Sequence, residues 1–576
     1  ATLLLAPFLI AAPEALRERT YEGVVYTSDQ TWSGNFSLDE NVVIASGATL
    51  LIESGTHINV TEDITITIQG NLQIHGTTEA PVSIWGSWFA ENSVQARWQG
   101  FLLDSGSVAS VLHAMISDSR GGFDVESGAS LTIESTHFVD SMIGVWNKGS
   151  MMGAGFECQS ATTTCLRVDG IANLDRVASS NSAGVVHIAN GGDATIDLVE
   201  SDLDSDVLVL DGGSTYSGEI QAAGFTRMIR ASDSVTATVT AIATGTGETL
   251  VDASMVAGLE LINGNTTNIT VSRILIGTVQ DIRMSSIEYE CDGTANCIDA
   301  QIQGELVVTD SLFAQQPSDS SVFTRLRGDG IVRMDNITLA SSTVLFDVAG
   351  NGQFNISDSQ LSVHSAGTIS GWGLEMANSS MVGVENGLTL LDVQSSISDS
   401  EFSRTFSMSD STSFGLRAVW SEVLLDDVIV AGWNDGIRCE SACTITGTSV
   451  NAGDGGRNSG SALTCDGGLI KLQSVETSAS DVGIDLIDGQ VHIEEWSVDM
   501  AHRTYGIQLA NDAHATIRNM PSYTSSGVHD GFGDGTLLWG STGAPDLAVT
   551  IEQSFSESTI TVTDLVGQSI AGASVT

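Results

Sequence analysis

The chain has 576 residues with 61 Gly and only 6 Pro, and its 71 acidic and 21 basic residues give a formal net charge of -50. This length exceeds one ordinary core and indicates either several domains or one elongated repeat, while the Gly-, Ser-, Thr- and Val-rich composition favours many short strands joined by tight turns. The negative charge argues against nucleic acid and anionic membranes as partners, and against polyanionic sugars unless divalent cations bridge them.

The chain begins with ATLLLAPFLIAAPEA, in which an apolar run from Leu3 to Ala12 precedes small residues and Pro13. This run is too short to span a bilayer, but it is typical of the apolar region of a secretory signal peptide. We therefore predict that residues 1–20 are a signal-peptide remnant at the start of a longer reading frame, with a partial membrane anchor as the alternative. The rest of the chain has no segment apolar enough to cross a membrane.

From residue 34 onward, alternating strands and tight turns recur at a nearly constant spacing. GATLLIESGTHINV, from Gly47, alternates apolar residues on both sides of a Ser-Gly turn. Neighbouring units are 23, 21, 19 and 23 residues apart where none is skipped. A period near 22 indicates a solenoid, so we predict an all-β right-handed parallel β-helix over residues 21–540, with three strands and about 22 residues per coil. Similar units begin at Gly121, Gly144, Cys165, Gly184, Cys297, Val344, Phe414, Asp435, Gly483 and Gly506.

The alternation within a unit also predicts which side chains point inward. In GIDLIDGQVHI, Ile484 and Leu486 are expected to face the core on one side of the coil, and Val491 and Ile493 on the next. The unit that begins at Gly506 should place Ile507 and Leu509 on Ile484 and Leu486, one coil further along.

Six of the seven cysteines form close pairs around polar turn residues. Such pairs are typical of local disulfides in exported proteins, whereas their spacings do not suit a zinc site. One cysteine is left over, and the sequence does not decide which of Cys439, Cys443 and Cys465 it is. The disulfide candidates are Cys158 with Cys165, Cys291 with Cys297, and Cys439 with Cys443.

The last residues depart from the repeat. LAVTIEQSFSESTITVTDLVGQSIAGASVT alternates apolar residues without the 22-residue period. It resembles the first strands of carboxypeptidase-regulatory-like or other immunoglobulin-like modules. We therefore predict that residues 541–576 begin a β-sandwich that the chain does not complete.

The segment 34–87, with ARWQGFLLDSGS from Ala96, resembles the opening of secreted right-handed parallel β-helix proteins with the pectin-lyase-like fold. That resemblance implies the fold and an exported surface protein, but it does not imply an activity. The matching residues are Gly47, Ala48, Thr49, Leu50, Gly55, Thr56, Gly70, Leu72, Gly76, Thr77, Pro81 and Val82.

Family members that cleave polygalacturonan use either clustered Asp with calcium and an Arg base, or paired Asp with His and Lys. The pair Asp426-Asp427 is flanked by strand-like residues, but His75-Gly76 lies far upstream, against the chain order of the hydrolytic pattern. In a regular strand the two aspartates point to opposite faces, which is unsuited to paired-carboxylate catalysis. We predict no catalytic residue, with Asp427, Asp435 and Arg438 as the alternative cluster.

Two other groups bear on metal binding. His492 and His514 are 22 residues apart, so they could stack in successive coils, and Asp530 and Asp534 lie in a Gly-rich loop. We predict an ordinary polar His pair and a cap or interdomain turn, because neither pattern matches a known ligand spacing. No cofactor or metal site is therefore predicted, with Ca²⁺ at the loop as the alternative.

Four tryptophans near the start, Trp32, Trp85, Trp88 and Trp98, are predicted to cap the apolar end of the first coil. Together these features predict an exported cell-surface or extracellular rod, adhesin or binding scaffold. Its expected partners are extracellular polysaccharide or other cell-surface components. One alternative is a polysaccharide lyase or glycoside hydrolase of the same fold, and another is a carbohydrate- or calcium-binding module that serves a neighbouring domain.

Overall fold

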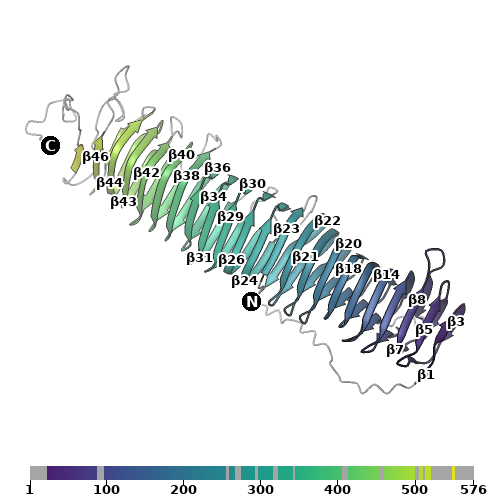
Figure 1. Ribbon diagram of the computed structural model, residues 1–576. Coiled ribbons are helices and arrows are strands. Elements are labelled where there is room, and N and C mark those ends of the chain that lie inside the picture. Colours follow the sequence, from purple (N-terminus) through teal and green to yellow (C-terminus); the bar gives the residue numbers. More distant parts are fainter. Residues whose placement is uncertain are drawn as a thin grey trace, which may run out of the picture.

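A computed structural model shows one long rod built from parallel strands (Figure 1). About 19 turns of chain stack along its axis. The structure describes residues 23–86, 97–254, 258–265, 274–291, 296–315, 322–340, 344–404, 413–453, 460–499, 505–509, 513–519 and 548–551. The predicted signal-peptide remnant and nearly all of the predicted β-sandwich segment, in which only β47 is placed, lie outside these residues.

The described residues form 47 strands in one sheet. The first coils have three separate short strands each: β1 Val24–Tyr26, β2 Gln30–Trp32, β3 Asn35–Leu38, β4 Val42–Ile44, β5 Thr49–Glu53, β6 His57–Val60, β7 Thr65–Ile68, β8 Asn71–His75, β9 Val82–Gly86, β10 Gly100–Leu103, β11 Val108–Leu112, β12 Ala114–Ser117 and β13 Gly121–Val125.

In the next coils some strands continue around a corner without interruption. All the strands of these coils, long and short, are β14 Ser130–Val139, β15 Ile143–Asn147, β16 Ser150–Gln159, β17 Thr164–Val168, β18 Ile171–Ser180, β19 Gly184–Ile188, β20 Asp193–Leu210, β21 Thr215–Ser232, β22 Thr236–Ser254, β23 Gly258–Asn265, β24 Ile274–Ser285, β25 Glu288–Cys291, β26 Ile298–Thr309 and β27 Leu312–Gln315.

The C-terminal half of the rod is built in the same way. Its strands are β28 Val322–Gly328, β29 Ile331–Asp335, β30 Thr338–Ala340, β31 Val344–Gly350, β32 Gln353–Ser357, β33 Gln360–Ser362, β34 Ser365–Ser370, β35 Gly373–Ala377, β36 Ser380–Gly383, β37 Asn386–Leu391, β38 Gln394–Arg404, β39 Phe414–Val419, β40 Glu422–Ala431, β41 Asp435–Glu440, β42 Thr444–Gly453, β43 Ser461–Ser478, β44 Val482–Val498, β45 Tyr505–Leu509, β46 His514–Asn519 and β47 Ala548–Ile551.

Each coil contributes one strand segment to each of three faces. Face A contains β13, β15, β17 and β19 and, further along, β39, β41 and the first residues of β43 and β44. Face B contains the first halves of β14, β16 and β18, and face C contains their second halves. The pairing is parallel throughout the described ladder, so each inward side chain lies on its equivalent in the next coil.

The predicted stacking is confirmed near the end of the rod. Ile484 pairs with Ile507, and Leu486 pairs with Leu509. Ile484, Leu486 and Ile507 are buried, as are Val491 and Ile493. Alternation alone was sufficient for this prediction, because a strand that has one face on the core must bury every second side chain.

The corners between faces repeat a backbone motif that periodicity did not indicate. A residue with positive φ is followed by a buried serine, as at Asn378 (φ 47°) and Ser379. Ser379 Oγ donates to the carbonyl of Ala377 (2.7 Å) and accepts the N–H of Ser359 in the neighbouring coil (3.1 Å). Asp and Asn suit this conformation because their side chains tolerate the left-handed region. The same pair occurs at Asp118-Ser119, Asp140-Ser141, Asn181-Ser182, Asp310-Ser311, Asp358-Ser359 and Asp399-Ser400.

The early tryptophans do not form a common end cap. Trp32 is partly buried against the first coils and meets Phe36 edge-on, as a cap would. Trp98 is instead fully buried in the core, where it begins a series of aromatic contacts that continues through Phe101 and Phe123. Trp85 lies on the outside of face C, because it occupies an outward position of β9. The capping prediction is therefore wrong for Trp85 and Trp98, and Trp88 is outside the described residues.

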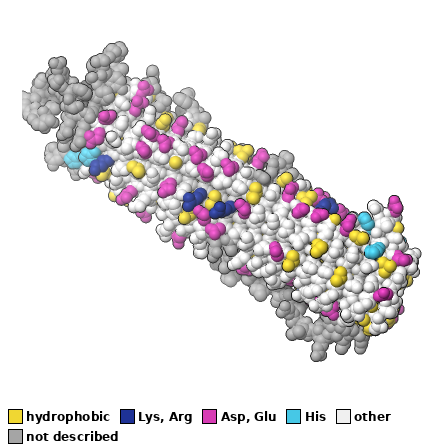
Figure 2. Space-filling view, viewed as in Figure 1, with side chains coloured by type: hydrophobic (Ala, Val, Ile, Leu, Met, Phe, Trp, Pro, Cys, Tyr) yellow, Lys and Arg dark blue, Asp and Glu magenta, His cyan; other side chains and the backbone are white. Residues whose placement is uncertain are grey.

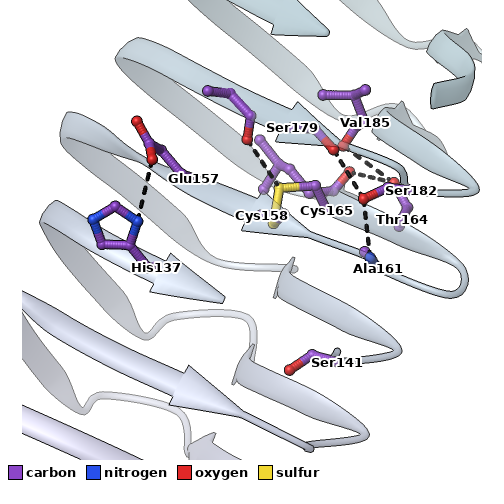
Figure 3. The surroundings of a disulfide bond; sticks show 12 residues. His137, Ser141, Glu157, Cys158, Ala161, Thr164, Cys165, Ser179, Ser182 and Val185 are labelled. Atoms are coloured by element: carbon purple, nitrogen blue, oxygen red, sulfur yellow. Dashed lines mark hydrogen bonds and ion pairs between the residues drawn. A yellow bond between two sulfur atoms is a disulfide. The ribbon is translucent and has the colours of Figure 1, made fainter. Parts of the chain in front are cut away.

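The three predicted disulfides are present, and they lie inside the rod. Cys158–Cys165, Cys291–Cys297 and Cys439–Cys443 each bridge a corner from within the core. Figure 3 shows Cys158 and Cys165 facing each other beside the corner residues Thr164 and Ser182. The disulfides fix the direction in which one face passes into the next. Cys465 is the free cysteine, and it is buried.

Candidate charged surface on face A

Face A carries many of the cations of this acidic chain, and each of those described below lies beside a carboxylate. Near the N-terminal end, Trp146 has Lys148 Nζ 4.1 Å and the Arg167 guanidinium 4.7 Å from its ring centroid. Its indole N–H donates to Asp169 (2.9 Å), and Arg167 also pairs with Asp169 (3.2 Å). Figure 2 shows basic side chains next to acidic ones on the visible surface.

The same arrangement continues along the rod. Arg227 donates through two nitrogens to Asp206 (2.8 and 2.9 Å), and this hydrogen bonding raises the pKa of Arg227 above its ordinary value. Further on, Arg327 lies 2.6 Å from Asp347. Face A is thus a series of ion pairs between successive coils, and Arg is suited to it because its guanidinium can span two carboxylates.

The densest part of this series lies on β39, β41, β43 and β44. Arg438 donates to Asp435 (3.1 Å) and to Glu440 (2.9 Å), and Arg417 from the previous coil donates to the same Glu440 (2.7 Å). Asp485 occupies the matching outward position two coils beyond Arg438, with Thr464 between them in the ladder. We call Asp435, Arg438, Glu440, Arg417 and Asp485 the Arg438 cluster.

Two carboxyl groups in this cluster have different surroundings. Burial raises the pKa of Asp485 to about 6, with the charges of Asp435 and Asp466 adding to the shift and Arg438 opposing it. Asp435 instead accepts the N–H of Ser461 (2.9 Å) as well as its bond from Arg438. A carboxyl group with a raised pKa, on the same face as a second carboxyl group, is a feature that acid–base catalysis can use.

An exposed tryptophan lies at the edge of the Arg438 cluster. Trp420 follows β39 at a corner, has a positive φ of 50° and leaves 59% of its surface exposed. Its backbone N–H is directed at the carbonyl of Glu440 (3.3 Å). A large apolar side chain in the left-handed region is unusual and marks a position worth testing, because aromatic rings beside polar groups commonly line ligand sites.

The structure divides the predicted Asp427, Asp435 and Arg438 cluster. Asp435 and Arg438 are in contact, but Asp427 lies at a different corner, in a hollow on face C. Asp426 and Asp427 are also both exposed, so the prediction that they point to opposite faces is wrong. The reason is that Asp427 has a φ of 51° and forms the corner itself, which interrupts the alternation.

The two histidines that could have stacked in successive coils are not register partners. His514 pairs with Gln490 in the ladder, whereas His492 pairs with Thr516. The two histidines are therefore offset by two positions, because this coil is two residues longer than the period assumed. Asp530 and Asp534 lie outside the described residues. Among the described residues there is no group of three or more His, Cys, Asp or Glu side chains arranged to hold a metal ion.

Among the described residues, face C carries hollows that include two of about 460 Å³ each. In the first, Ala178 stands where neighbouring coils carry Glu157 and Glu200, and Arg176 bridges these two carboxylates at 2.7 and 2.5 Å. Arg176 thus forms ion pairs with both carboxylates that line this hollow. The second hollow is lined by corner and face C residues, among them Asp358, Asn378, Asp399, Glu401 and Asp427.

Sequence reasoning missed Asp485, Glu440 and Arg417, although the signal was present. Arg417 and Arg438 occupy the same outward position in FGLRAV and DGIRCE, and Asp485 occupies it in VGIDLI. Comparing outward as well as inward positions of aligned units would have grouped Arg417, Arg438 and Asp485.

The described residues include no helix long and apolar enough to cross a membrane. Comparison of the chain with models of known protein families gave no match, and comparison with curated proteins gave none either. The parallel β-helix therefore follows from the ladder itself, and kinship with pectin-lyase-like proteins remains a prediction.

Proposed function

We propose that this chain is an exported, cell-surface or extracellular rod that acts as a structural spacer or binding scaffold. The main support for this proposal is the unbroken parallel ladder from β1 to β46. Its fixed number of coils sets the distance between the two ends of the described rod. At about 4.8 Å per coil, about 19 turns span about 90 Å. Three buried disulfides and the strongly acidic composition support a location outside the reducing cytoplasm.

The location is tested on intact cells of the native host. Protease added outside the cells, or a membrane-impermeant amine or carboxyl label, should reach the protein while a cytoplasmic marker stays protected. Electron microscopy of the purified chain should show straight particles of about 90 Å. Protection of the protein in intact cells would contradict an exported rod.

A second function, cleavage of a polysaccharide, is favoured by one observation. The Arg438 cluster includes Asp485, whose pKa is raised to about 6 by burial and by the charge of Asp435, and Trp420 is exposed at the edge of the cluster. In a hydrolase, Asp485 would protonate the leaving oxygen and Asp435 would activate water, as paired carboxylates do.

This second function is tested by incubating the purified protein with neutral and acidic polysaccharides and measuring new reducing ends and unsaturated products. Asp485→Asn and Asp435→Asn should each lower product formation at least a hundredfold. Glu260→Gln, an exposed change on face B, should leave it unchanged. Absence of product from the unmodified protein would leave the scaffold as the function.

A further inference from the structure

Three cysteines meet at one corner of two successive coils. Cys439 is the last residue but one of β41 on face A and is bonded to Cys443 across the corner. Cys465 is the register partner of Cys439 in the next coil, and both side chains are fully buried. Register partners in adjacent strands lie about 4.8 Å apart, which is within the Cα separation of about 4.4–6.8 Å that a disulfide requires.

The two thiol positions have equivalent surroundings. Cys439 Sγ lies 3.9 Å from the carbonyl of Leu469, and Cys465 Sγ lies 3.8 Å from the carbonyl of Gln490, which is the register partner of Leu469. Cys465 thus repeats the placement of Cys439 one coil further along.

Cys465 differs from Cys439 in having no cysteine across its own corner. Thr444, which follows Cys443, pairs with Leu469, which follows Gly468. Gly468 therefore takes the place that Cys443 has in the previous coil, and Cys465 has a sulfur neighbour only in the coil before it.

We propose that Cys465 exchanges with the Cys439–Cys443 disulfide, so that a bond within one coil converts into a bond between two coils. The Cys465 thiol gives up its proton, and its sulfur attacks Cys439 Sγ. The Cys439–Cys465 bond forms, the Cys439–Cys443 bond breaks, and Cys443 leaves as a thiolate that takes up a proton. The step is an isomerisation and needs no oxidant or reductant.

The exchange changes what the disulfide holds together. The Cys439–Cys443 bond closes a separation of only 4 residues, whereas a Cys439–Cys465 bond closes 26 residues and ties β41 to β43. A longer closed loop restricts the unfolded chain more. The exchanged form should therefore resist separation of these coils, which lie towards the C-terminal end of the described rod.

Tryptic peptides of the non-reduced protein distinguish the two forms. Cleavage after Arg438, Arg457 and Lys471 places Cys439 and Cys443 together on residues 439–457 and Cys465 alone on residues 458–471. Before exchange, residues 458–471 carry an alkylated thiol. After exchange, they are covalently joined to residues 439–457, and the alkylated thiol is at Cys443.

The native protein is incubated without added oxidant, quenched with acid and alkylated before digestion. Burial, together with the charges of Asp466 and Asp488, raises the pKa of the Cys465 thiol. The joined peptide should therefore accumulate about tenfold faster for each unit of pH between 7 and 9. Cys158–Cys165 and Cys291–Cys297 have no third cysteine nearby among the described residues and serve as internal controls that stay unchanged.

Two variants complete the test. Cys465→Ser should abolish the joined peptide and leave Cys439–Cys443 intact. Cys443→Ser leaves Cys439 and Cys465 as thiols, which a mild oxidant should join within one molecule while the size-exclusion profile stays that of the monomer. If Cys465 stays fully alkylated at pH 9 in the native protein, or if oxidised and folded Cys443→Ser gives no joined peptide, the proposal is wrong.

Discussion

Asp485 is an outward residue whose ionisation should lower the stability of the fold. Its pKa is about 6 in the folded chain and about 3.8 as an ordinary aspartate. Well below pH 3.8 the group is protonated in both states and has no effect on stability. Between pH 4 and 6 the unfolded chain ionises first, so the stability of the fold decreases as the pH rises.

We expect Asp485→Asn to remove this loss. The variant should match the unmodified protein at pH 4 and exceed its free energy of unfolding by about 1–2 kcal/mol at pH 7.5, a value reduced from the full shift because the side chain is partly exposed. Thermal unfolding from pH 4 to 8 measures this, with Glu260→Gln as the control. A variant less stable than the unmodified protein at pH 7.5 would show that Asp485 forms a favourable ion pair instead.

For single residues, the two-residue alternation predicts the direction of a side chain only within a regular strand. Ile484 and Leu486 were placed correctly because a regular strand requires only a two-residue period. Asp427 was placed wrongly because the rule fails at a residue with positive φ, and the sequence LLDDVIV does not show where the strand bends. His492 and His514 do not stack for a related reason, since their coil is longer than the mean.

The corner is the element that keeps the faces in register. The contribution of its buried serine to stability can be tested by substitution. Ser379→Ala would remove the acceptor for the Ser359 N–H. A buried N–H without a partner costs about 1–3 kcal/mol. Thermal unfolding should show this loss, and hydrogen exchange at Ser359 should become faster.

The neighbouring Ser380 gives a matched control, because it is the next residue but points outward on face C. Ser380→Ala should change the free energy of unfolding by less than about 0.5 kcal/mol. Equal effects of the two substitutions would mean that the corner hydrogen bond does not stabilise the rod. This design compares the same chemical change on the two sides of one strand.

The corner motif was visible in the sequence as Asp-Ser or Asn-Ser pairs at spacings close to the coil length, for example at Asp358-Ser359, Asn378-Ser379 and Asp399-Ser400. Such pairs alone do not predict a corner, because they are common in a chain so rich in serine. The Cys pairs were informative because cysteine is rare here and their spacing is short. The residues of the Arg438 cluster belong to different coils, so predicting the cluster required a comparison of the outward positions of aligned units as well as the inward ones.

At the scale of the whole molecule, the net charge of -50 should weaken the fold through self-repulsion. Sodium chloride raised from 10 to 500 mM should therefore increase the midpoint of thermal unfolding by about 2–5 °C, because screening shortens the range of repulsion. Calcium chloride at matched ionic strength separates screening from specific binding. A decrease in the midpoint with sodium chloride would mean that the ion pairs of face A outweigh the repulsion.

In a solenoid, deletion of one whole coil should preserve the fold, whereas deletion of part of a coil should not. Ser130 pairs with Ser150, and the Ser150 N–H already donates to the carbonyl of Ala129 (3.0 Å), so deletion of residues 130–149 joins two points that lie side by side. The remaining coils can then stack with every face preserved, since each coil contacts only its neighbours.

Deletion of residues 140–149 is the control, because it removes the face A strand alone and turns the following coils out of register. We expect the first variant to keep its strand circular dichroism and monomeric elution with a rod about 5 Å shorter, and the second to aggregate. Similar damage from both deletions would mean that specific contacts of this coil, such as its aromatic packing, matter more than the repeat.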